Sequence, residues 1–338
     1  MEVNEKKKAL ITGITGQDGS YLAEQLLAKG YEVSGIVRKT SHFLYANIAH
    51  VQERLNLIQA DLLDPVSIRE AFQKAMPDEI YNLASQSAPS ESFRQPIHTA
   101  EITGIGAHRV IDAALDTVPK AKFYQASSSE MFGWVKEIPQ TEETPFNPAN
   151  PYAAAKLYAH NIARIYRKSY NMFIACGILF NHESPRRGLG FVTQKITYAA
   201  ACAKLGVRNS VHLNEEGEPI FKNGKVALGN LEAKRDWGFA GDYTEAMWKM
   251  LQEKLPDDYI VATGEVHTIR ELCQEAFGYL NLDWEKYVVT DKRFIRPTET
   301  GPLVGDYSKA RKKLGWKPKT SFKELVAILV EANIARLK

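Results

Sequence analysis

A short turn that holds three glycines is the feature that most constrains how this chain can fold. The turn, Gly13-Ile14-Thr15-Gly16-Gln17-Asp18-Gly19, directly follows the apolar run Ala9–Thr12 and opens a helical pattern with Leu22 and Leu26 on one face. Glycines let a backbone approach a pyrophosphate closely, and the positive end of the helix dipole offsets its charge. The turn therefore predicts a dinucleotide-binding strand–turn–helix unit, with a tight turn that binds nothing as the alternative.

Strand and helix patterns alternate through the first half of the chain. We expect strands at Ala9–Thr12, Tyr31–Val37, Leu55–Ala60, Glu79–Leu83, Lys122–Ala126 and Met172–Phe180. Gly30 is expected to end the first helix, Asp64-Pro65 to begin the next, and a longer helix to run from about Tyr152 to Tyr170. This alternation predicts an α/β fold, a Rossmann-type, doubly wound parallel sheet with helices on both faces.

The alternation stops after Phe180, where segments rich in Arg, Gly, Pro and Asn separate isolated helices. We therefore expect a dinucleotide-binding Rossmann domain over residues 1–180 and a smaller C-terminal lobe over 181–338. The lobe is expected to bind mainly the substrate, and some of its segments to return to the main domain. Within it, Val207–Leu228 carries Glu216-Gly217 and Asn223-Gly224, and the second pair is typical of a type I′ turn. One or two short hairpins are expected there.

Charge and cysteine usage exclude several classes of protein. With 43 Lys and Arg against 40 Asp and Glu, the formal net charge of +3 does not indicate a partner nucleic acid or a membrane surface. Cys176, Cys202 and Cys273 have neither a disulfide pattern nor a metal-ligand spacing, so no metal is expected. The longest strongly apolar stretch, Met172–Phe180, is too short to cross a bilayer, and no targeting segment is visible. We expect a soluble, cytoplasmic protein.

The end of the second expected strand indicates which dinucleotide binds. A chain that binds NAD usually places Asp or Glu here for the ribose 2′-hydroxyl, whereas Arg38, Lys39, Thr40 and Ser41 offer two cations and two hydroxyls. Cations favour a 2′-phosphate, so NADP is the expected cofactor, and a solvated basic turn is the alternative. At the end of the third strand, Asp61-Leu62 could flank the adenine or be ordinary loop residues.

Four residues in the middle of the chain offer acid–base chemistry. Tyr152 and Lys156 are four residues apart at the start of a helix, so both lie on one face. We expect the Lys156 ammonium to lower the pKa of Tyr152 and make it a base. Ser128 and Glu130 follow the fifth strand, at the edge of the sheet where open α/β folds bind ligands. In isolation, Glu130 would be read as a surface carboxylate and Tyr152/Lys156 as an exposed helix face.

These elements together resemble the short-chain dehydrogenase/reductase superfamily in its extended, nucleotide-sugar-modifying branch, and within it the GDP-mannose 4,6-dehydratase family. The resemblance runs through nearly the whole chain. Its most specific motifs are NHESPRRG (181–188) and KRDWG (234–238), and it includes GITGQDGSYL (13–22), YNLASQS (81–87), FYQASSSEMFG (123–133), PYAAAKLYAH (151–160) and GDYSKARKKLGW (305–316).

The resemblance assigns roles position by position. It implies that Ser128, Glu130, Tyr152 and Lys156 are catalytic. It implies that NADP is contacted by Gly13, Thr15, Gly16, Gln17, Asp18, Gly19, Arg38, Lys39, Thr40, Ser41, Asp61, Leu62, Leu83, Ser85, Gln86, Ser87, Lys156, His182 and Arg187. It implies GDP-sugar contacts from Ser87, Ser128, Asn181, Lys195, Arg235, Arg296 and Glu299. Arg and Lys suit a diphosphate, which Arg can bind with two hydrogen bonds.

The implied reaction is an internal redox dehydration that gives a GDP-4-keto-6-deoxy sugar, by a homodimer or homotetramer. Three departures from the family pattern leave the sugar open between mannose and a manno-heptose: Ala88-Pro89, His98 and the longer Val207–Leu228 segment. An epimerase, reductase or decarboxylase of the same branch is a rival reading, although Glu130 argues against most epimerases. A non-catalytic NADP-binding scaffold is the remaining alternative, which the intact catalytic residues disfavour.

Overall fold

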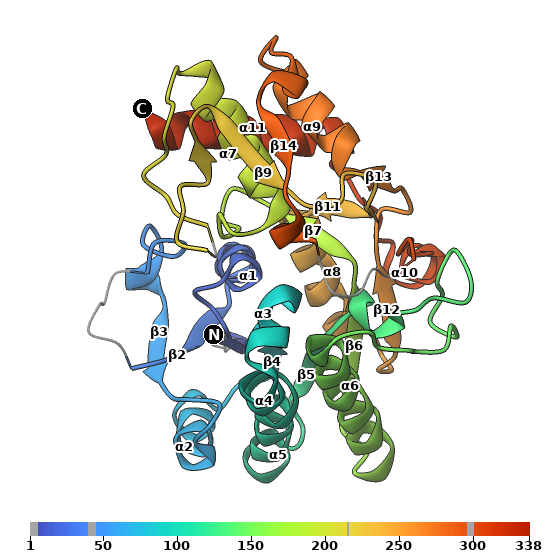
Figure 1. Cartoon of the computed structure of the whole chain (residues 1–338). Coiled ribbons are helices and arrows are strands. Elements are labelled where there is room, and N and C mark those ends of the chain that lie inside the picture. The colour runs from blue at the N-terminus through green and yellow to red at the C-terminus, as the bar shows by residue number, and fades with distance from the viewer. Residues whose placement is uncertain (1–5, 40–44, 215, 296–300) are drawn as a thin grey trace.

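A parallel sheet forms the centre of the molecule and places the glycine turn at its middle (Figure 1). The structure is a computed structural model that describes residues 6–39, 45–214, 216–295 and 301–338. Seven strands pair in the order β12-β6-β5-β4-β1-β2-β3, and every pair is parallel. They are β1 (Lys8–Thr12), β2 (Glu32–Val37), β3 (Asn56–Gln59), β4 (Glu79–Asn82), β5 (Lys122–Ser128), β6 (Ile174–Leu179) and β12 (Asp258–Val261). The predicted doubly wound α/β fold is confirmed.

Helices cover both faces of this sheet (Figure 1). One face carries α2 (Pro65–Ala75), α5 (Gly106–Thr117) and α6 (Pro151–Ser169), and the other carries α1 (Gln17–Ala28), α8 (Ala240–Gln252) and α10 (Ser308–Leu314). The Asp64 carboxylate accepts a hydrogen bond from the Val66 amide at 3.0 Å and caps α2, with Pro65 in the first turn, as the sequence predicted. Gly30 follows α1 with φ of 84°, which favours glycine.

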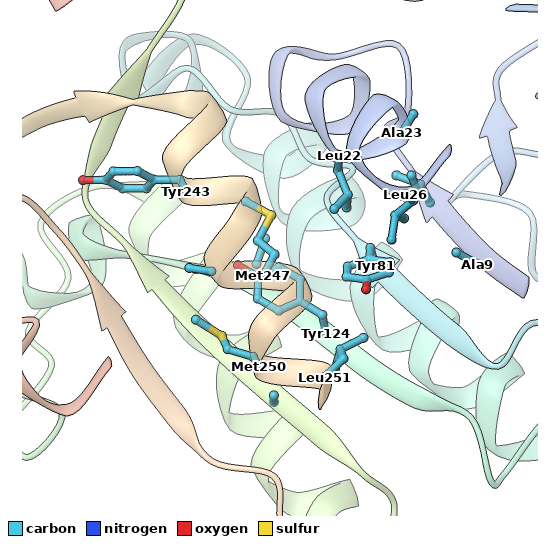
Figure 2. Packing of buried hydrophobic residues seen from close by; sticks show 14 of the residues in the cluster. Ala9, Leu22, Ala23, Leu26, Tyr81, Tyr124, Tyr243, Met247, Met250 and Leu251 are labelled. Atoms are coloured by element: carbon cyan, nitrogen blue, oxygen red, sulfur yellow. The ribbon is translucent and has the colours of Figure 1, made fainter. Parts of the chain in front are cut away.

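The core beneath α1 and α8 fixes the helix that follows the glycine turn (Figure 2). Leu22 and Leu26 of α1 and Met247 of α8 pack with Tyr81 of β4 and Tyr124 of β5, and all five side chains are fully buried. Burying an apolar side chain of this size contributes roughly 1.5–3 kcal/mol. This packing holds the N-terminus of α1 against the carboxyl edge of the sheet.

The C-terminal lobe has a core of its own. The helices α7 (Val192–Lys204), α9 (Ile269–Gly278) and α11 (Phe322–Leu337) bury Tyr198, Phe277 and Leu329. Short strands complete it: β8 (Phe221–Lys222), β9 (Lys225–Leu228) and β14 (Val288–Thr290), with β7 (Asn181–Glu183) beside β11 (Trp237–Phe239) and β10 (Lys234–Arg235) beside β13 (His267–Thr268). The expected hairpin exists: β8 and β9 pair around Asn223 and Gly224, whose φ values are 51° and 75°.

Segments from the second half of the chain also complete the main sheet. The strand β12 pairs with β6 at its edge, and α8 and α10 cover one face of it. The division at residue 180 stays a prediction. Within the described ranges, no helix is both long and apolar enough to span a membrane.

Candidate active site

A cavity of about 540 Å³ opens at the carboxyl edge of the sheet, where strand order reverses between β1 and β4. Open α/β sheets bind ligands at such a point because the neighbouring loops diverge there. The predicted residues that line it are Gly13, Thr15, Gly16, Gln17, Asp18, Gly19, Arg38, Asp61, Leu62, Leu83, Ser85, Gln86, Ser87, Ser128, Glu130, Tyr152, Lys156, Asn181, His182 and Arg187. Residues far apart in the sequence thus meet in one place.

The glycine turn is tight enough to require its glycines. Gly13 has φ of 71°, and a Cβ there would lie 2.9 Å from the Ala84 amide nitrogen. A Cβ on Gly19 would lie 2.3 Å from the Gly13 carbonyl oxygen. Gly16 is the N-cap of α1 and gives it no side-chain cap. The first amides of α1 therefore stand at the cavity without a capping side chain, which fits a dinucleotide pyrophosphate.

Two buried polar atoms at the cavity could form hydrogen bonds with a polar ligand. The Arg187 Nε and the Gln86 Oε1 are buried and have no hydrogen-bond partner within the described part of the chain. The Arg187 guanidinium lies 3.7 Å from the centre of the Phe191 ring and its Nε 3.6 Å from Glu183 Oε2, so these contacts hold the cation at the cavity wall. Buried polar groups usually have partners, and a bound anion would supply one for Arg187.

An ion pair joins the glycine turn to the NHESPRRG segment. His182 Nδ1 donates to the Phe180 carbonyl oxygen at 2.7 Å, so its Nε2 faces Asp18 Oδ2 at 2.9 Å. Burial alone would raise the pKa of Asp18, but the His182 charge and hydrogen bonds outweigh it and lower that pKa to about 2. Burial lowers the pKa of His182 and the charge and hydrogen bond of Asp18 raise it. The net result is a raised pKa. The ring also stacks on Tyr243, with centroids 4.6 Å apart.

This ion pair predicts a pH-dependent stability. Ionised Asp18 stabilises the fold at pH values above its ordinary pKa of 3.8, and this stabilisation is lost as the pH falls towards 2. Protonated His182 stabilises the fold at pH values below its ordinary pKa of 6.5, and this stabilisation is lost as the pH rises through the raised pKa of His182 in the folded protein. We expect Asp18→Asn to lower the free energy of unfolding by about 2 kcal/mol between these limits and by less at alkaline pH, measured by urea unfolding. Asp116→Asn, which breaks an exposed pair with Arg69, should change it little at either pH.

The four predicted catalytic residues lie together at the cavity. The Ser128 hydroxyl accepts a hydrogen bond from the Glu130 amide at 3.2 Å and is hydrogen-bonded to the Tyr152 hydroxyl. Lys156 is one turn further along α6, with its Nζ 5.8 Å from the centre of the Tyr152 ring. All four side chains are at least nine-tenths buried, at 5–8% exposure. Burial in a water-poor pocket strengthens electrostatic interactions among such groups.

The expected effect of Lys156 on Tyr152 is wrong for the protein by itself. Burial raises the pKa of Tyr152 to about 12, and the Ser128 hydrogen bond only partly offsets this. Lys156 is not among the groups that lower the pKa of Tyr152, and its Nζ donates to the Ala126 carbonyl oxygen at 2.9 Å. Burial also lowers the pKa of Lys156 to about 8. Sequence spacing correctly placed both residues on one helix face, but it could not show that burial dominates.

A buried network behind the cavity fixes the strand that carries Ser128. His160, Cys176 and Asp258 bring their ligand atoms within 4.8 Å of one another. Arg167 donates to Asp258 Oδ1 at 2.6 Å, so a guanidinium already neutralises this carboxylate and the group is better described as an ion-pair network than as a cation site. Burial lowers the pKa of His160 to about 4, and its Nδ1 is hydrogen-bonded to the Ser127 hydroxyl at 2.8 Å.

Seven predicted residues are not placed at the cavity by the described part of the structure. Thr40, Ser41, Arg296 and Glu299 are outside the described residues. Lys39, Lys195 and Arg235 are described but do not line the cavity. Lys195 Nζ lies 4.8 Å from the centre of the Phe294 ring, and Arg235 Nη1 donates to the Lys234 carbonyl oxygen at 2.7 Å. Their roles stay predictions.

The structure adds a residue that sequence reasoning missed. Asn150 caps α6, and its side-chain amide also contacts Glu130 at 2.9 Å. The only sequence signal was the pattern Asn-Pro at a helix start, which predicts a cap but says nothing of Glu130.

Comparison with known proteins identifies the group to which this chain belongs. A sequence model described as GDP-mannose 4,6 dehydratase matches residues 10–329. The chain belongs to the GDP-mannose 4,6 dehydratase family. It is 48% identical to GDP-mannose 4,6 dehydratase 2 of Arabidopsis thaliana, over 99% of this chain and 89% of that protein. It is 45% identical to the human GDP-mannose 4,6 dehydratase, over 98% and 92% of the two chains.

Solved structures support the fold. A dTDP-glucose 4,6-dehydratase from Streptomyces venezuelae, with NAD and TYD bound, superposes with a TM-score of 0.81 at 23% identity and covers 96% of both chains. A structure of RMD from Pseudomonas aeruginosa with NADPH has a TM-score of 0.79 at 23% identity, over 98% of this chain and 100% of that one. At this identity the likeness shows the Rossmann architecture that the family shares.

Proposed function

We propose that this protein is a GDP-mannose 4,6-dehydratase, a hydro-lyase that converts a GDP-manno-configured sugar to its GDP-4-keto-6-deoxy derivative. The observation that carries the proposal is the meeting of Ser128, Glu130, Tyr152 and Lys156 around one cavity that begins at a dinucleotide turn. Membership of the family, with relatives of this printed name at 41–48% identity, supports it.

The residues divide the proton transfers between them. Tyr152, as its phenolate, would take the proton of the sugar 4-hydroxyl, and the Ser128 hydroxyl, which is hydrogen-bonded to Tyr152, would position that group. Glu130 would then remove the proton at C5, which the 4-ketone acidifies, and return a proton to the leaving 6-hydroxyl as water departs. When hydride returns to C6, C5 would take up one proton, which balances the proton that Tyr152 took in the first step. General acid–base help of this kind is worth about 10²–10⁴-fold per group.

A nicotinamide dinucleotide fits the cavity and supplies what these side chains lack. When bound in its oxidised form, it would accept a hydride from C4, return one to C6 and add a positive charge that favours the Tyr152 phenolate. The glycine turn with the α1 N-terminus would hold its pyrophosphate, and Asp61 and Leu62 would lie at the adenine end. Because no net redox change occurs, the cofactor would not be consumed.

We infer that this cofactor is NADP. Arg38 directly follows β2 and lines the cavity where a ribose 2′-phosphate would lie in such folds. Its guanidinium carries a permanent positive charge. One structural neighbour was solved with NADPH and another with NAD, so the neighbours support a nicotinamide dinucleotide and the choice of NADP rests on Arg38.

Replacing Arg38 tests the choice between cofactors. We expect Arg38→Ser to weaken NADP binding by about 10-fold or more, because a charge-assisted hydrogen bond contributes about 1.5–3 kcal/mol, and to leave NAD binding nearly unchanged. Titration calorimetry with each dinucleotide measures both. Arg69→Ser, at an exposed position on α2, is the control. Equal loss for both dinucleotides would remove Arg38 from 2′-phosphate recognition.

The choice between two candidate sugars rests on two residues of the cavity wall that depart from the family pattern. Pro89, which opens α3 (Pro89–Arg94), and His98, in α4 (Pro96–Thr99), both line the cavity. Because these positions differ from the family pattern, GDP-manno-heptose is the second candidate substrate. An assay of GDP-mannose and GDP-manno-heptose for a 4-keto product tests the proposal, and the absence of product from both would overturn it. Assembly as a homodimer or homotetramer and a cytoplasmic location stay predictions.

A further inference from the structure

One side chain links the start of α6 to the proposed acid–base residue Glu130. Asn150 is the N-cap of α6, and its Oδ1 accepts a hydrogen bond from the Ala153 amide at 2.8 Å. Its Nδ2 donates to Glu130 Oε2 at 2.9 Å. A backbone amide can only donate, so Oδ1 must face Ala153 and the NH₂ group must face Glu130. The cap therefore fixes which way the amide points.

This arrangement restrains Glu130. The donated hydrogen bond fixes the carboxylate relative to α6, whose second residue is Tyr152, so the two proton-transfer groups are positioned by the same helix start. Reacting groups that are misplaced by about 1 Å can lose about 10²-fold in rate.

We propose that Asn150 is a positioning residue that orients the Glu130 carboxylate and holds it in register with Tyr152. This inference rests on the proposed function, in which Glu130 removes the C5 proton.

The substitution Asn150→Asp separates positioning from capping. Asp caps a helix as well as Asn does, so the α6 cap and the melting temperature should be kept. The carboxylate cannot donate to Glu130, however, and it adds a negative charge beside it. With GDP-mannose and NADP we expect kcat to fall by about 10²-fold with little change in KM.

Asn147→Asp is the matched control, because it makes the same chemical change three residues earlier. The Asn147 amide donates to the Trp134 carbonyl oxygen at 3.1 Å rather than to Glu130. This variant should keep both kcat and KM. If Asn150→Asp also keeps both, Asn150 is only a helix cap and the inference is wrong.

A second measurement keeps the inference separate from the proposed function. The NMR resonances of the Asn150 side-chain NH₂ group, assigned by their loss in Asn150→Asp, report its contact with Glu130 in the full chain without substrate. We expect Glu130→Gln to shift these resonances and Glu143→Gln to leave them in place, and unchanged resonances in Glu130→Gln would overturn the inference. If the wild type makes no keto product from either GDP-sugar, the proposed function fails, whereas these resonances still decide whether Asn150 binds Glu130.

Discussion

Glu130→Gln is expected to abolish turnover of the GDP-sugar while the protein still folds and binds its dinucleotide. Gln has the same shape, and its amide oxygen can accept the hydrogen bond that Asn150 now donates to Glu130 Oε2 at 2.9 Å. It cannot take or return a proton, however, so both the removal at C5 and the departure of water lose their acid–base group. We expect kcat to fall by at least about 10²–10⁴-fold.

The measurement is a single-turnover assay for the 4-keto product together with dinucleotide titration. Glu143→Gln, an exposed carboxylate on the loop before α6, is the control and should leave both values unchanged. Full turnover by Glu130→Gln would remove Glu130 from the mechanism and would favour a reaction without elimination, such as epimerisation.

Tyr152→Phe is expected to stop the reaction one step earlier, before the 4-ketone forms. The ring would still fill its buried place in α6, so the fold should be kept. The loss of the hydroxyl removes the group that takes the 4-hydroxyl proton and the partner of the Ser128 hydroxyl. We expect kcat to fall by about 10²–10⁴-fold, measured with the same assay.

Tyr158→Phe provides a matched comparison on the same helix. Its hydroxyl is hydrogen-bonded to His108 Nδ1 at 2.8 Å, away from the cavity lining, so turnover should persist. Equal activity losses in Tyr158→Phe and Tyr152→Phe would point to a general effect on α6 rather than to proton transfer.

The fold could be predicted from local sequence because its signals are local. Apolar runs, the Asp64-Pro65 helix start and the Asn223-Gly224 turn each specify a short piece of structure, and all of them are found. The strand β12 was not foreseen as the seventh strand, because its pairing with β6 joins residues about 80 positions apart that no local pattern connects. The return of α8 and α10 to the sheet is non-local in the same way.

The site was predictable where spacing alone decides the geometry. The glycine turn and the Tyr152/Lys156 pair are such cases, and both line the cavity. The pKa of Tyr152 was not predictable, because it depends on how deeply neighbouring segments bury the ring. The contact between Asn150 and Glu130 was missed for a similar reason, since it joins residues from two separate elements.

The central claim is that one hydride leaves C4 and returns to C6 of the same sugar, and isotope transfer tests it most directly. GDP-mannose that carries deuterium at C4 would be incubated with the enzyme and a catalytic amount of NADP in ordinary water, and the product analysed by mass spectrometry and NMR. The account predicts a 4-keto-6-deoxy product with deuterium at C6 and no net reduction of the cofactor. A product without deuterium at C6, or stoichiometric consumption of the cofactor, would contradict it.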